Sequence, residues 1–398
     1  MAGTRPPASG PARRVLHLGK FLPPHPGGIE RFLADLLPAQ RRLGLRPAVL
    51  AHADASDPAT GCRPAFGAAA VRARVLAQLA YAPVSPGWPC LLDRLVRRWR
   101  PHLLHLHLPN PSAFWALALP STRRLPWLVH WHADVPHDAL SLRLRLLYPA
   151  YRRLETAVLA RARRVVATSA AYAASSRPLA PWQDKVEVLP LGLADAAPAS
   201  PTPAAWPAGD GLRVLFVGRF SYYKGIGNLL EAVAATPGVR LLLVGDGEYA
   251  RAARERAGRP DLAGRVALPG ALDDGAVAGA LAAADLLCLP SIERSEAFGM
   301  VLLEAMRAAV PCLATRVAGS GMAEVLDADG SEPAGLVVAP ADVQALAAAL
   351  ARLRDDPGLR TRLGEAGSRR FQRRFRIANV ARDLDTVYRA CLGPAAGP

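Results

Sequence analysis

The stretch Leu212–Ala232, with the sequence LRVLFVGRFSYYKGIGNLLEA, joins a strand pattern to a helix pattern through one short loop. Its first part, LRVLFVG, is rich in Leu, Val and Phe and ends at Gly218, as buried strands commonly do. Gly227–Ala235 then has the pattern of a helix. Because a strand that leads directly into a helix is the repeating unit of parallel α/β sheets, this stretch predicts that architecture.

The same alternation continues on both sides. Toward the C-terminus we expect strands at Val239–Gly245, Asp285–Ser291 and Val310–Thr315. Helices are expected at Asp342–Arg354, Leu359–Phe371 and Ile377–Cys391. Toward the N-terminus we expect a helix at Ser141–Arg161 and strands at Arg14–Gly19, His102–Leu108, Trp127–His132 and Arg163–Ser169. A further helix is predicted by an apolar stripe at helical spacing, made of Ile29, Phe32, Leu33, Leu36 and Leu37.

Between these two sets lies Leu189–Gly211, whose Pro, Ala and Gly content is typical of a linker. The 398 residues are enough for two domains. We therefore expect an N-terminal domain over residues 1–190, a linker over 191–211, a C-terminal domain over 212–375, and a final helical segment over 376–398 that packs back toward the N-terminal domain. Ligands of such sheets bind beyond the carboxyl ends of the strands, so two facing sheets would enclose a cleft.

Composition narrows the class of protein. The formal charge of +16 favours anionic partners, such as phosphorylated substrates or an anionic membrane surface. No RNA-recognition, zinc-finger or helix-turn-helix signature accompanies this charge, so we expect no nucleic acid partner. The five cysteines lack CxxC spacing, the N-terminus lacks the apolar core of a signal peptide, and no apolar run reaches about 18 residues. These features predict a cytoplasmic protein with reduced thiols.

Two cations follow the strand in the opening stretch. Arg219 lies one residue past Gly218, and Lys224 lies just before Gly225 and the next helix. Both therefore lie at the sheet edge where ligands bind. A guanidinium and an ammonium together suit a diphosphate, although two solvated loop charges are the alternative interpretation.

Gly27 and Gly28 also follow a predicted strand and open a helix. Backbone N–H groups at such a helix start can approach a phosphate. A simple Pro-Gly turn fits the same residues equally well. The absence of a G-x-G-x-x-G motif excludes the dinucleotide fingerprint.

Two carboxylates flank the start of a predicted helix at Phe298–Arg307, whose buried surface we expect from Met300, Val301, Leu303 and Met306. Glu304 adjoins this surface, and a buried carboxylate needs hydrogen-bond donors such as the vicinal hydroxyls of a ribose. Glu296 precedes the helix, where an acid and open backbone amides can together hold a hydroxylated ring and the phosphate beside it. The alternative is an acid that stabilises the helix dipole and a second one on a solvated face.

These segments together resemble the family 4 glycosyltransferases, which are retaining enzymes. SEAFGMVLLEA carries the E-x7-E motif of that family, and FLPPHPGGIERFLADL, HLHLPNP, VHWHADV, VATSAAYAASS, VLFVGRFSYYKGIGNLLEA and LCLPSIERSEAFG follow in its order. The resemblance covers nearly the whole chain and implies an α/β protein of the GT-B fold, with two Rossmann-like doubly wound domains and an interdomain cleft. Two departures, Ala309 in place of a usual glycine and the long Asp327–Gly335 segment, fall outside the chemical positions.

The resemblance implies a role for each motif residue. The donor site would consist of Gly27, Gly28, Arg219 and Lys224 at the diphosphate, Glu304 at the ribose, Leu268 near the base, and Glu296, Phe298, Gly299 and Met300 at the transferred sugar. His132 would face the reacting sugar as a catalytic group with Glu296. Asp134 would assist the acceptor hydroxyl, as would His132.

The implied activity is a metal-independent, retaining transfer of a hexose, with a mannose-like sugar favoured, and no cofactor. The donor would be a nucleotide-diphospho-sugar and the acceptor a glycan or lipid-linked saccharide, in surface polysaccharide biosynthesis. Arginines at positions 94, 97, 98, 100, 123, 124, 143, 145, 152 and 153 suggest a peripheral position on anionic lipid at the inner membrane face. A nucleotide-sugar epimerase of the same fold and a non-catalytic glycan-binding protein are the alternatives.

Histidines raise the question of a metal. His105 and His107 share one strand face, as do His130 and His132, and four imidazoles on adjacent strands can bind an ion. We expect no metal, because no cysteine lies nearby and the resembled family works without one. His105 and His130 are expected to be core residues.

Overall fold

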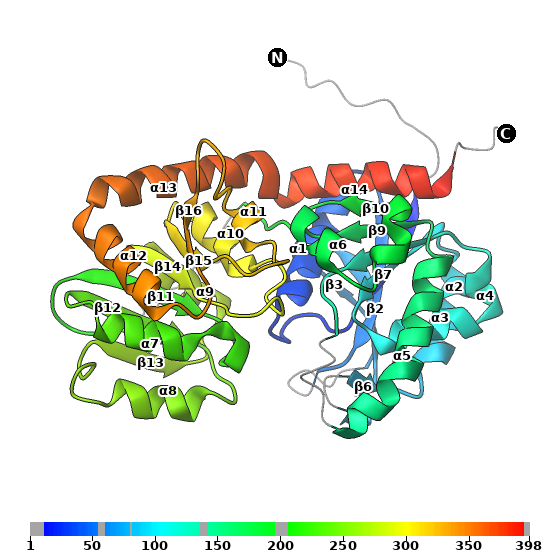
Figure 1. The fold of residues 1–398 in the computed structure, drawn as a ribbon. Helices are drawn as coiled ribbons and strands as arrows, with labels where there is room; N and C mark the ends of the chain where they lie inside the picture. The colour runs from blue at the N-terminus through cyan, green and yellow to red at the C-terminus, as the bar shows by residue number, and fades with distance from the viewer. Residues whose placement is uncertain (1–11, 55–59, 80–81, 136–141, 196–205, 394–398) are drawn as a thin grey trace, which may run out of the picture. The chain divides into compact units, whose positions relative to one another are not determined.

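The computed structural model describes residues 12–54, 60–79, 82–135, 142–195 and 206–393 (Figure 1). The chain forms two compact units. The first, called the N-unit, comprises Met1–Val166, Pro181–Glu187 and Ala381–Pro398. The second, called the C-unit, comprises Ala167–Ala180 and Val188–Val380. Residues 196–205 of the predicted linker and Ser141 of the predicted helix lie outside the described residues.

The N-unit is built on an eight-stranded sheet with the order β10-β9-β8-β7-β1-β2-β4-β3. Its strands are β1 (Arg14–Leu18), β2 (Arg46–His52), β3 (Gly61–Ala65), β4 (Ala68–Ala73), β7 (Leu103–Leu108), β8 (Trp127–Trp131), β9 (Arg164–Ala167) and β10 (Val186–Val188). From β4 through β2, β1 and β7 to β8 the neighbours are parallel. Because the order runs outward from β1 in both directions, the sheet is doubly wound, with its switch point between β1 and β7.

The N-unit also contains two antiparallel pairs that the sequence did not predict, one at the edge of the main sheet and one in a separate two-stranded sheet. β3 pairs antiparallel with β4, and β5 (Ala77–Leu79) pairs antiparallel with β6 (Ala82–Val84). In the turn from β3 to β4, Phe66 and Gly67 have φ angles of 49° and 68°. Two left-handed residues in a two-residue loop define a type I′ hairpin, which Asn-Gly or Asp-Gly usually signals. Phe66 occupies the position of the usual Asn or Asp, so the sequence gives no clear signal for this hairpin.

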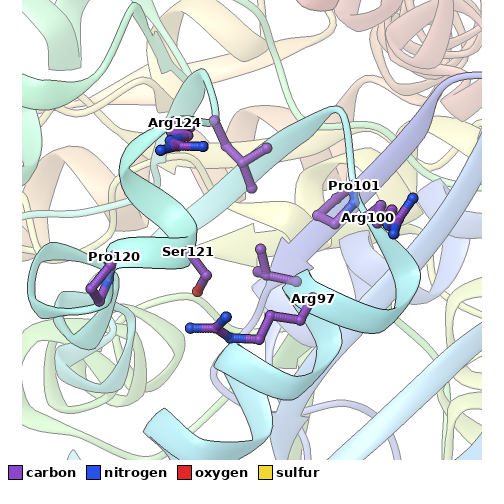
Figure 2. Close-up of a pocket in the computed structure, with 8 residues that line it drawn as sticks. Arg97, Arg100, Pro101, Pro120, Ser121 and Arg124 are labelled. Atoms are coloured by element: carbon purple, nitrogen blue, oxygen red, sulfur yellow. The ribbon is translucent and has the colours of Figure 1, made fainter.

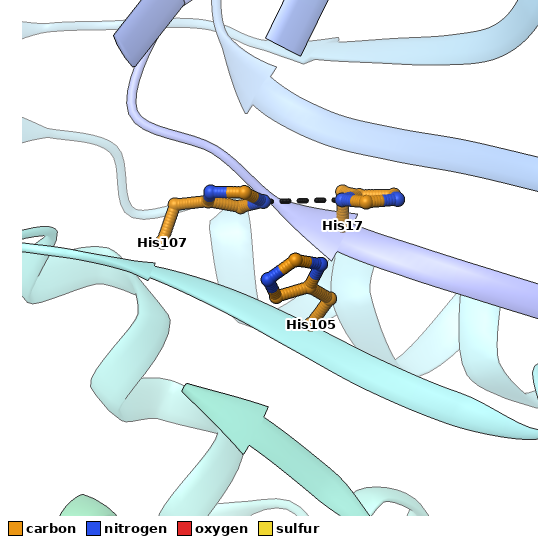
Figure 3. A group of neighbouring side chains, drawn as sticks. All are labelled: His17, His105 and His107. Atoms are coloured by element: carbon orange, nitrogen blue, oxygen red, sulfur yellow. Dashed lines mark hydrogen bonds between the residues drawn. The ribbon is translucent and has the colours of Figure 1, made fainter. Parts of the chain in front are cut away.

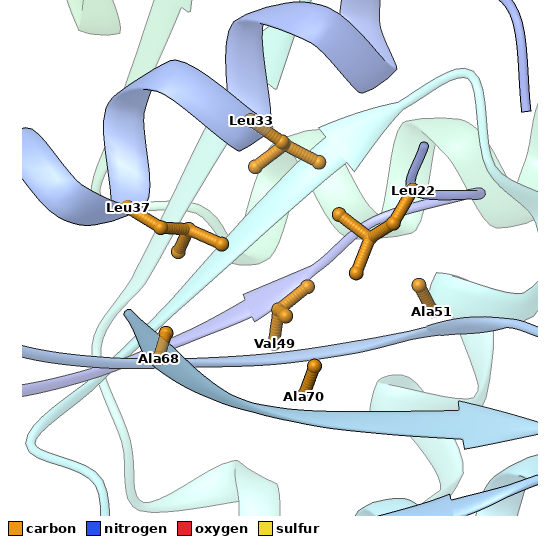
Figure 4. Close-up of a cluster of buried hydrophobic side chains, with 7 residues drawn as sticks. All are labelled: Leu22, Leu33, Leu37, Val49, Ala51, Ala68 and Ala70. Carbon is orange, nitrogen blue, oxygen red and sulfur yellow. The ribbon is translucent and has the colours of Figure 1, made fainter. Parts of the chain in front are cut away.

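The helices of the N-unit are α1 (Gly28–Arg42), α2 (Trp88–Trp99), η1 (Pro111–Phe114), α3 (Trp115–Ala118), α4 (Pro120–Arg123), α5 (Leu142–Arg161) and η2 (Ala180–Lys185). The predicted apolar stripe of α1 is confirmed. Leu33 and Leu37 pack on a buried cluster whose other members are Leu22, Val49, Ala51, Ala68 and Ala70 (Figure 4). A fully buried leucine stabilises a fold by about 1.5–3 kcal/mol, so this cluster fixes α1 on the sheet.

The C-unit has a six-stranded sheet with the order β13-β12-β11-β14-β15-β16. Its strands are β11 (Leu212–Val217), β12 (Val239–Val244), β13 (Val266–Gly270), β14 (Leu286–Leu289), β15 (Cys312–Thr315) and β16 (Gly335–Val338). All neighbours are parallel. β12, β14 and β15 are buried along their whole length, as expected for parallel strands covered on both faces. The order is again doubly wound, with the switch point between β11 and β14.

The helices of the C-unit are α6 (Ala170–Ser175), η3 (Tyr222–Lys224), α7 (Ile226–Ala234), α8 (Ala250–Ala257), α9 (Asp274–Ala282), α10 (Met300–Arg307), α11 (Met322–Val325), α12 (Val343–Asp355), α13 (Pro357–Arg370) and a π-helical segment η4 (Phe371–Phe375). The last helix, α14 (Ile377–Leu392), begins in the C-unit and enters the N-unit at Ala381. No helix within the described ranges is both long and apolar enough to span a bilayer.

The strands and helices predicted from the sequence are confirmed within a few residues. The prediction for α10 is wrong in its details: the helix begins at Met300 rather than at Phe298. Its buried residues are Leu302, Leu303, Ala305 and Met306, whereas Met300 and Val301 are only half-buried.

Candidate active site

The strand order of the C-unit places a ligand-binding edge at the carboxyl ends of β11 and β14. Gly218 and Arg219 follow β11, and the segment that follows β14 leads to Glu296. The structure brings these two loops together, because the Lys224 ammonium donates a hydrogen bond to the Glu296 carboxylate and forms an ion pair with it. Two of the residues predicted from separate motifs therefore meet at the switch point of the sheet.

Glycines at this edge allow the backbone segments of neighbouring loops to pack closely against one another. Gly225 has a φ of 66°, and a Cβ on it would lie 2.1 Å from the carbonyl oxygen of Pro290. A Cβ on Gly245, at the end of β12, would lie 1.9 Å from the carbonyl oxygen of Gly218. The Lys224 ammonium nitrogen lies 3.4 Å from the position of a Cβ on Gly218. The absence of a side chain at these glycines therefore lets the backbone of neighbouring loops and the Lys224 ammonium approach this edge closely.

Both partners of the ion pair are largely removed from water, with side-chain exposures of 11% for Lys224 and 12% for Glu296. Burial opposes the charge of Lys224 and is the largest single influence, but Glu296 and Tyr223 together raise the pKa of Lys224 above its usual value. Burial raises the pKa of Tyr223, and Arg219 acts on it electrostatically, so Arg219 belongs to the same group of charges. Arg219 itself is exposed.

The start of α10 contributes open backbone amides. Gly299 caps the helix with a φ of 81°, and no side chain among the described residues caps it. Glu304 is half-buried one turn later, so it lies on the same helix face as Met300. Phe298 is buried with its ring edge-on to Phe375, 6.3 Å between centroids. This packing fixes the loop from which the helix starts.

Leu268 lies on β13, two strands from β11, and is half-buried. The strand ends at Gly270, whose carbonyl oxygen accepts a hydrogen bond of 2.9 Å from the Gly245 N–H. Leu268 therefore belongs to the same sheet as the Lys224–Glu296 pair.

In the N-unit, Gly27 caps α1 and Gly28 is its first residue. Among the described residues no side chain caps this helix. Sequence reasoning missed Glu30, whose carboxylate folds back over the helix start: a Cβ on Gly27 would lie 2.2 Å from Glu30 Oε2. Glu30 is buried, and this burial raises its pKa. The acidic third residue of a predicted helix was the available signal.

Besides His52 on β2, five buried imidazoles lie in one group along the N-unit sheet. They are His17 on β1, His105 and His107 on β7, His130 on β8, and His132 just after β8. His17 and His107 are joined by ring nitrogens 3.1 Å apart, and His107 and His132 by nitrogens 3.0 Å apart. Burial lowers the pKa of His17 to about 4 and that of His132 to about 3. The rings are therefore neutral near pH 7.

His17 was not among the histidines singled out from the sequence, and neither were two polar residues that hold the group. Gln40 of α1 bonds His17, and Tyr388 of α14 bonds both Gln40 and His105. These contacts join segments up to 348 residues apart, so no local pattern announces them. The prediction that His105 and His130 lie in the core agrees with their burial.

Asp134 follows His132 by two residues and is half-buried. Its carboxylate accepts a hydrogen bond of 2.9 Å from the indole N–H of Trp131, which is fully buried. The last residue of β8 thereby orients Asp134 next to the carboxyl edge of the N-unit sheet.

A basic hollow of about 470 Å³ is a separate feature of the N-unit (Figure 2). Arg97 of α2, Arg100 at the end of that helix and Arg124 after α4 contribute to its walls together with Ser121. Arg97 also binds Asp93 through a hydrogen bond of 2.7 Å. All three arginines belong to the set that the sequence associated with anionic surfaces.

Two doubly wound sheets, one in each unit, agree with the GT-B fold. Solved structures agree on the fold. Sucrose-phosphate synthase from Thermosynechococcus elongatus has a TM-score of 0.74 at 24% identity, covering 95% of this chain and 98% of that one. Anabaena Alr3699/HepE in complex with UDP and glucose has a TM-score of 0.73 at 18% identity, covering 95% and 100%.

The chain belongs to the family 4-type glycosyltransferases. Residues 27–192 match the Glycosyl transferase 4-like domain, and residues 204–370 match Glycosyl transferases group 1. The chain is 30% identical to O-antigen chain mannosyltransferase C of Escherichia coli, over 91% of this chain and 94% of that protein. It is 32% identical to phosphatidyl-myo-inositol mannosyltransferase of Mycolicibacterium smegmatis, over 75% of each chain.

Proposed function

We propose that the protein is a retaining hexosyltransferase that moves a mannose-like sugar from a nucleotide-diphospho-sugar to a glycan or lipid-linked saccharide. The observation that carries this proposal is the buried pair of Lys224 and Glu296 at the switch point of the C-unit sheet. The names of the two mannosyltransferase relatives support the choice of sugar and the link to surface glycans. The bound UDP in the Anabaena protein supports a nucleotide donor.

The ion pair suits a site whose partners change when the donor binds. Without a ligand, each buried charge satisfies the other, which avoids the cost of an unpaired buried charge. When the donor binds, we propose that the Lys224 ammonium leaves Glu296 and, together with Arg219, binds the diphosphate. Glu296 then accepts hydrogen bonds from hydroxyls of the transferred sugar, and the open amides at the start of α10 lie beside it. Glu304 holds the ribose, and Leu268 lies near the base.

In the proposed reaction the bond between the sugar C1 and the phosphate oxygen breaks, and its electron pair leaves with the diphosphate. The acceptor oxygen forms a new bond to C1 on the same face, and its proton passes to an oxygen of the leaving phosphate. Arg219 and Lys224 stabilise the negative charge that develops on the leaving group, so no metal ion is required there. No carboxylate has to act as a nucleophile, in contrast to retaining glycosidases.

The proposal gives the N-unit three roles. The backbone amides at Gly27 and Gly28 stabilise the leaving diphosphate, which requires that Glu30 carry little charge when the donor is bound. Burial raises the pKa of Glu30 and so favours its neutral form. His132 faces the reacting sugar, and Asp134 assists the acceptor hydroxyl. Glu30→Gln should therefore preserve transfer, whereas Glu30→Ala would also remove the packing over the helix start.

We further propose that the enzyme acts in the cytoplasm, at the inner membrane face. The arginine-lined hollow of the N-unit offers three cations to anionic lipid headgroups or to the diphosphate of a lipid-linked acceptor. Binding to vesicles that contain an anionic lipid, measured by co-sedimentation, tests this part of the proposal. Binding that is independent of lipid charge would contradict it.

A thermal-shift screen with GDP-, UDP- and ADP-sugars tests the donor. One class should raise the melting temperature of the wild type, and Lys224→Ala should abolish that rise. Incubation with this donor alone then separates transfer from epimerisation, because an epimerase would release an altered nucleotide sugar without an acceptor. Binding of the donor with no turnover on any lipid-linked saccharide would instead favour the glycan-binding alternative.

A further inference from the structure

We propose that His17, His105 and His107 bind a divalent transition-metal ion in the core of the N-unit, with zinc as the expected occupant (Figure 3). One ring nitrogen of each lies within 4.8 Å of the other two, and all three side chains are buried. Imidazole nitrogens are preferred ligands of zinc and its neighbours in the periodic table. The ion takes no part in the proposed sugar transfer, and the inference does not depend on that proposal.

The spacing of the nitrogens fits a metal site. His17 Nδ1 and His107 Nε2 lie 3.1 Å apart. In a tetrahedral site with zinc–nitrogen bonds of about 2.0–2.1 Å, two ligand nitrogens lie about 3.3 Å apart. His105 Nε2 is buried and has no hydrogen-bond partner within the described part of the chain. Coordination would satisfy this atom.

The outer nitrogens of the three rings carry the strongest argument. Each one is held by a polar partner: His17 Nε2 by Gln40 Oε1 at 2.9 Å, His105 Nδ1 by the Tyr388 hydroxyl at 2.8 Å, and His107 Nδ1 by His132 Nε2 at 3.0 Å. An outer hydrogen bond of this kind keeps the ring proton away from the metal and fixes the ring orientation, as is usual for metal-binding histidines. In the structure the inner nitrogens His17 Nδ1 and His107 Nε2 are hydrogen-bonded to each other, so an ion that binds between them would release one ring proton.

A second histidine triad, His107, His130 and His132, meets the same distance limit but lacks this support. Both nitrogens of His130 and the Nδ1 of His132 are buried without a hydrogen-bond partner among the described residues. Nothing polar would then fix those two rings as ligands. The His17 triad is favoured for this reason, and its fourth coordination position is left to water, as in other three-histidine zinc sites.

From the sequence we expected no metal, because no cysteine lies nearby and the resembled family works without one. The sequence also does not show which residues orient these histidines. Gln40 and Tyr388 come from distant helices, and they convert a row of core imidazoles into a set with defined inner and outer nitrogens. A metal bound to this triad would also determine which ring nitrogen of His132 carries the proton. With a metal on His107 Nε2, the Nδ1–H of His107 donates to His132 Nε2, which places the ring proton of His132 on Nδ1.

The test is the metal content and metal affinity of the full-length protein, expressed with a tag that contains no histidine. We expect one zinc ion per chain by mass spectrometry of the purified protein. After chelation, added Co²⁺ should give the visible absorption of a tetrahedral site at one equivalent. Folded wild-type protein that contains less than about a tenth of an equivalent of metal and gives no such absorption would overturn the proposal.

Variants locate the ion. His105→Gln and His17→Gln should abolish Co²⁺ absorption, whereas His102→Gln, a control on the residue before β7 and outside both triads, should retain it. Because the buried variants can fail to fold, Tyr388→Phe serves as a milder test: losing the outer bond of His105 should weaken Co²⁺ binding about 10–100-fold in a folded protein. Absorption that survives His105→Gln and is lost in His130→Gln would contradict the assignment.

Discussion

The two units of this glycosyltransferase differ in the charge of the polar side chains that they bury: one buries an ion pair and the other buries neutral imidazoles. The C-unit holds an ammonium and a carboxylate, Lys224 and Glu296, in direct contact. Within the described residues, the N-unit holds six buried, neutral imidazoles, and hydrogen bonds join several of them to one another. All nine histidines of the chain occur at or before His137, so the C-unit has none.

This difference teaches what each arrangement is suited for. Removing one partner of a buried ion pair leaves the other charge buried and unpaired. Such a pair therefore suits a site where a ligand replaces one partner. Neutral imidazoles cost less to bury and offer lone pairs in fixed directions, so they suit permanent ligation or the positioning of one reactive ring. Each of the following experiments disturbs one side of this comparison.

Lys224→Ala should have the largest effect. It leaves the Glu296 carboxylate buried without its cation, so we expect unfolding free energy to fall by about 3–5 kcal/mol. The loss of a charge at the leaving diphosphate should lower kcat/KM about 10²–10³-fold. Urea unfolding and initial transfer rates measure the two effects.

The double variant Lys224→Met with Glu296→Leu is the matched control. Because both charges are removed, it should recover most of the stability but none of the activity. A double variant as unstable as Lys224→Ala would show that an unpaired charge is not the cause of the loss.

Acid should destabilise the N-unit before the C-unit. Burial lowers the pKa of His52 to about 4, as it does for His17. The neutral rings therefore stabilise the fold above pH 6.5, and this contribution is lost as the pH falls from 6.5 toward 4. Each such histidine accounts for about 3 kcal/mol across this range. Hydrogen exchange at pH 7 and pH 5, corrected for intrinsic rates, should show lost protection in the N-unit alone; equal loss in both units would contradict the account.

Glu304→Gln should have a smaller effect, chiefly on donor binding. The amide keeps the shape of the side chain but loses the negative charge that accepts hydrogen bonds from the ribose. Hydrogen bonds to a charged group contribute about 1.5–3 kcal/mol, so donor affinity should fall about 10–100-fold. Thermal stability without donor should change little. Unchanged donor affinity would remove Glu304 from the site.

Arg124→Gln should have the smallest effect. Each cation near an anionic membrane surface contributes about 1 kcal/mol, so vesicle affinity should fall about fivefold. Transfer to a soluble acceptor analogue should be unchanged. Arg251→Gln, on the exposed face of α8 in the C-unit, is the matched control for charge alone, and an equal effect there would make the hollow irrelevant.

The parallel α/β architecture of both units could be predicted from local patterns, because strand and helix periodicities and the glycine-marked strand ends of the C-unit depend on neighbouring residues. Several strands, among them β2, β3 and β16, were not predicted. The Lys224–Glu296 contact was less accessible: each residue stood out in its own motif, but only the sheet order brings them together. Ala309 illustrates a further limit. It adopts a φ of 56° at a position where the resembled family usually has glycine, and the sequence shows only the unusual residue.

The sequence showed four histidines of the imidazole group but not the residues that join them. His17, Gln40 and Tyr388 come from β1, α1 and α14, and nothing in the spacing of these residues relates them. Glu30 was hidden for another reason, since its position over Gly27 depends on the side chain folding back over its own helix start.

The central claim is that Lys224 exchanges Glu296 for the donor diphosphate without help from a metal ion. Calorimetric titration with the nucleoside diphosphate of the preferred donor, with and without added Mg²⁺, tests it most directly. We predict that wild-type affinity is the same in both conditions and that Lys224→Ala binds at least about 100-fold more weakly. Equal affinity in Lys224→Ala, or wild-type binding that requires Mg²⁺, would contradict the claim.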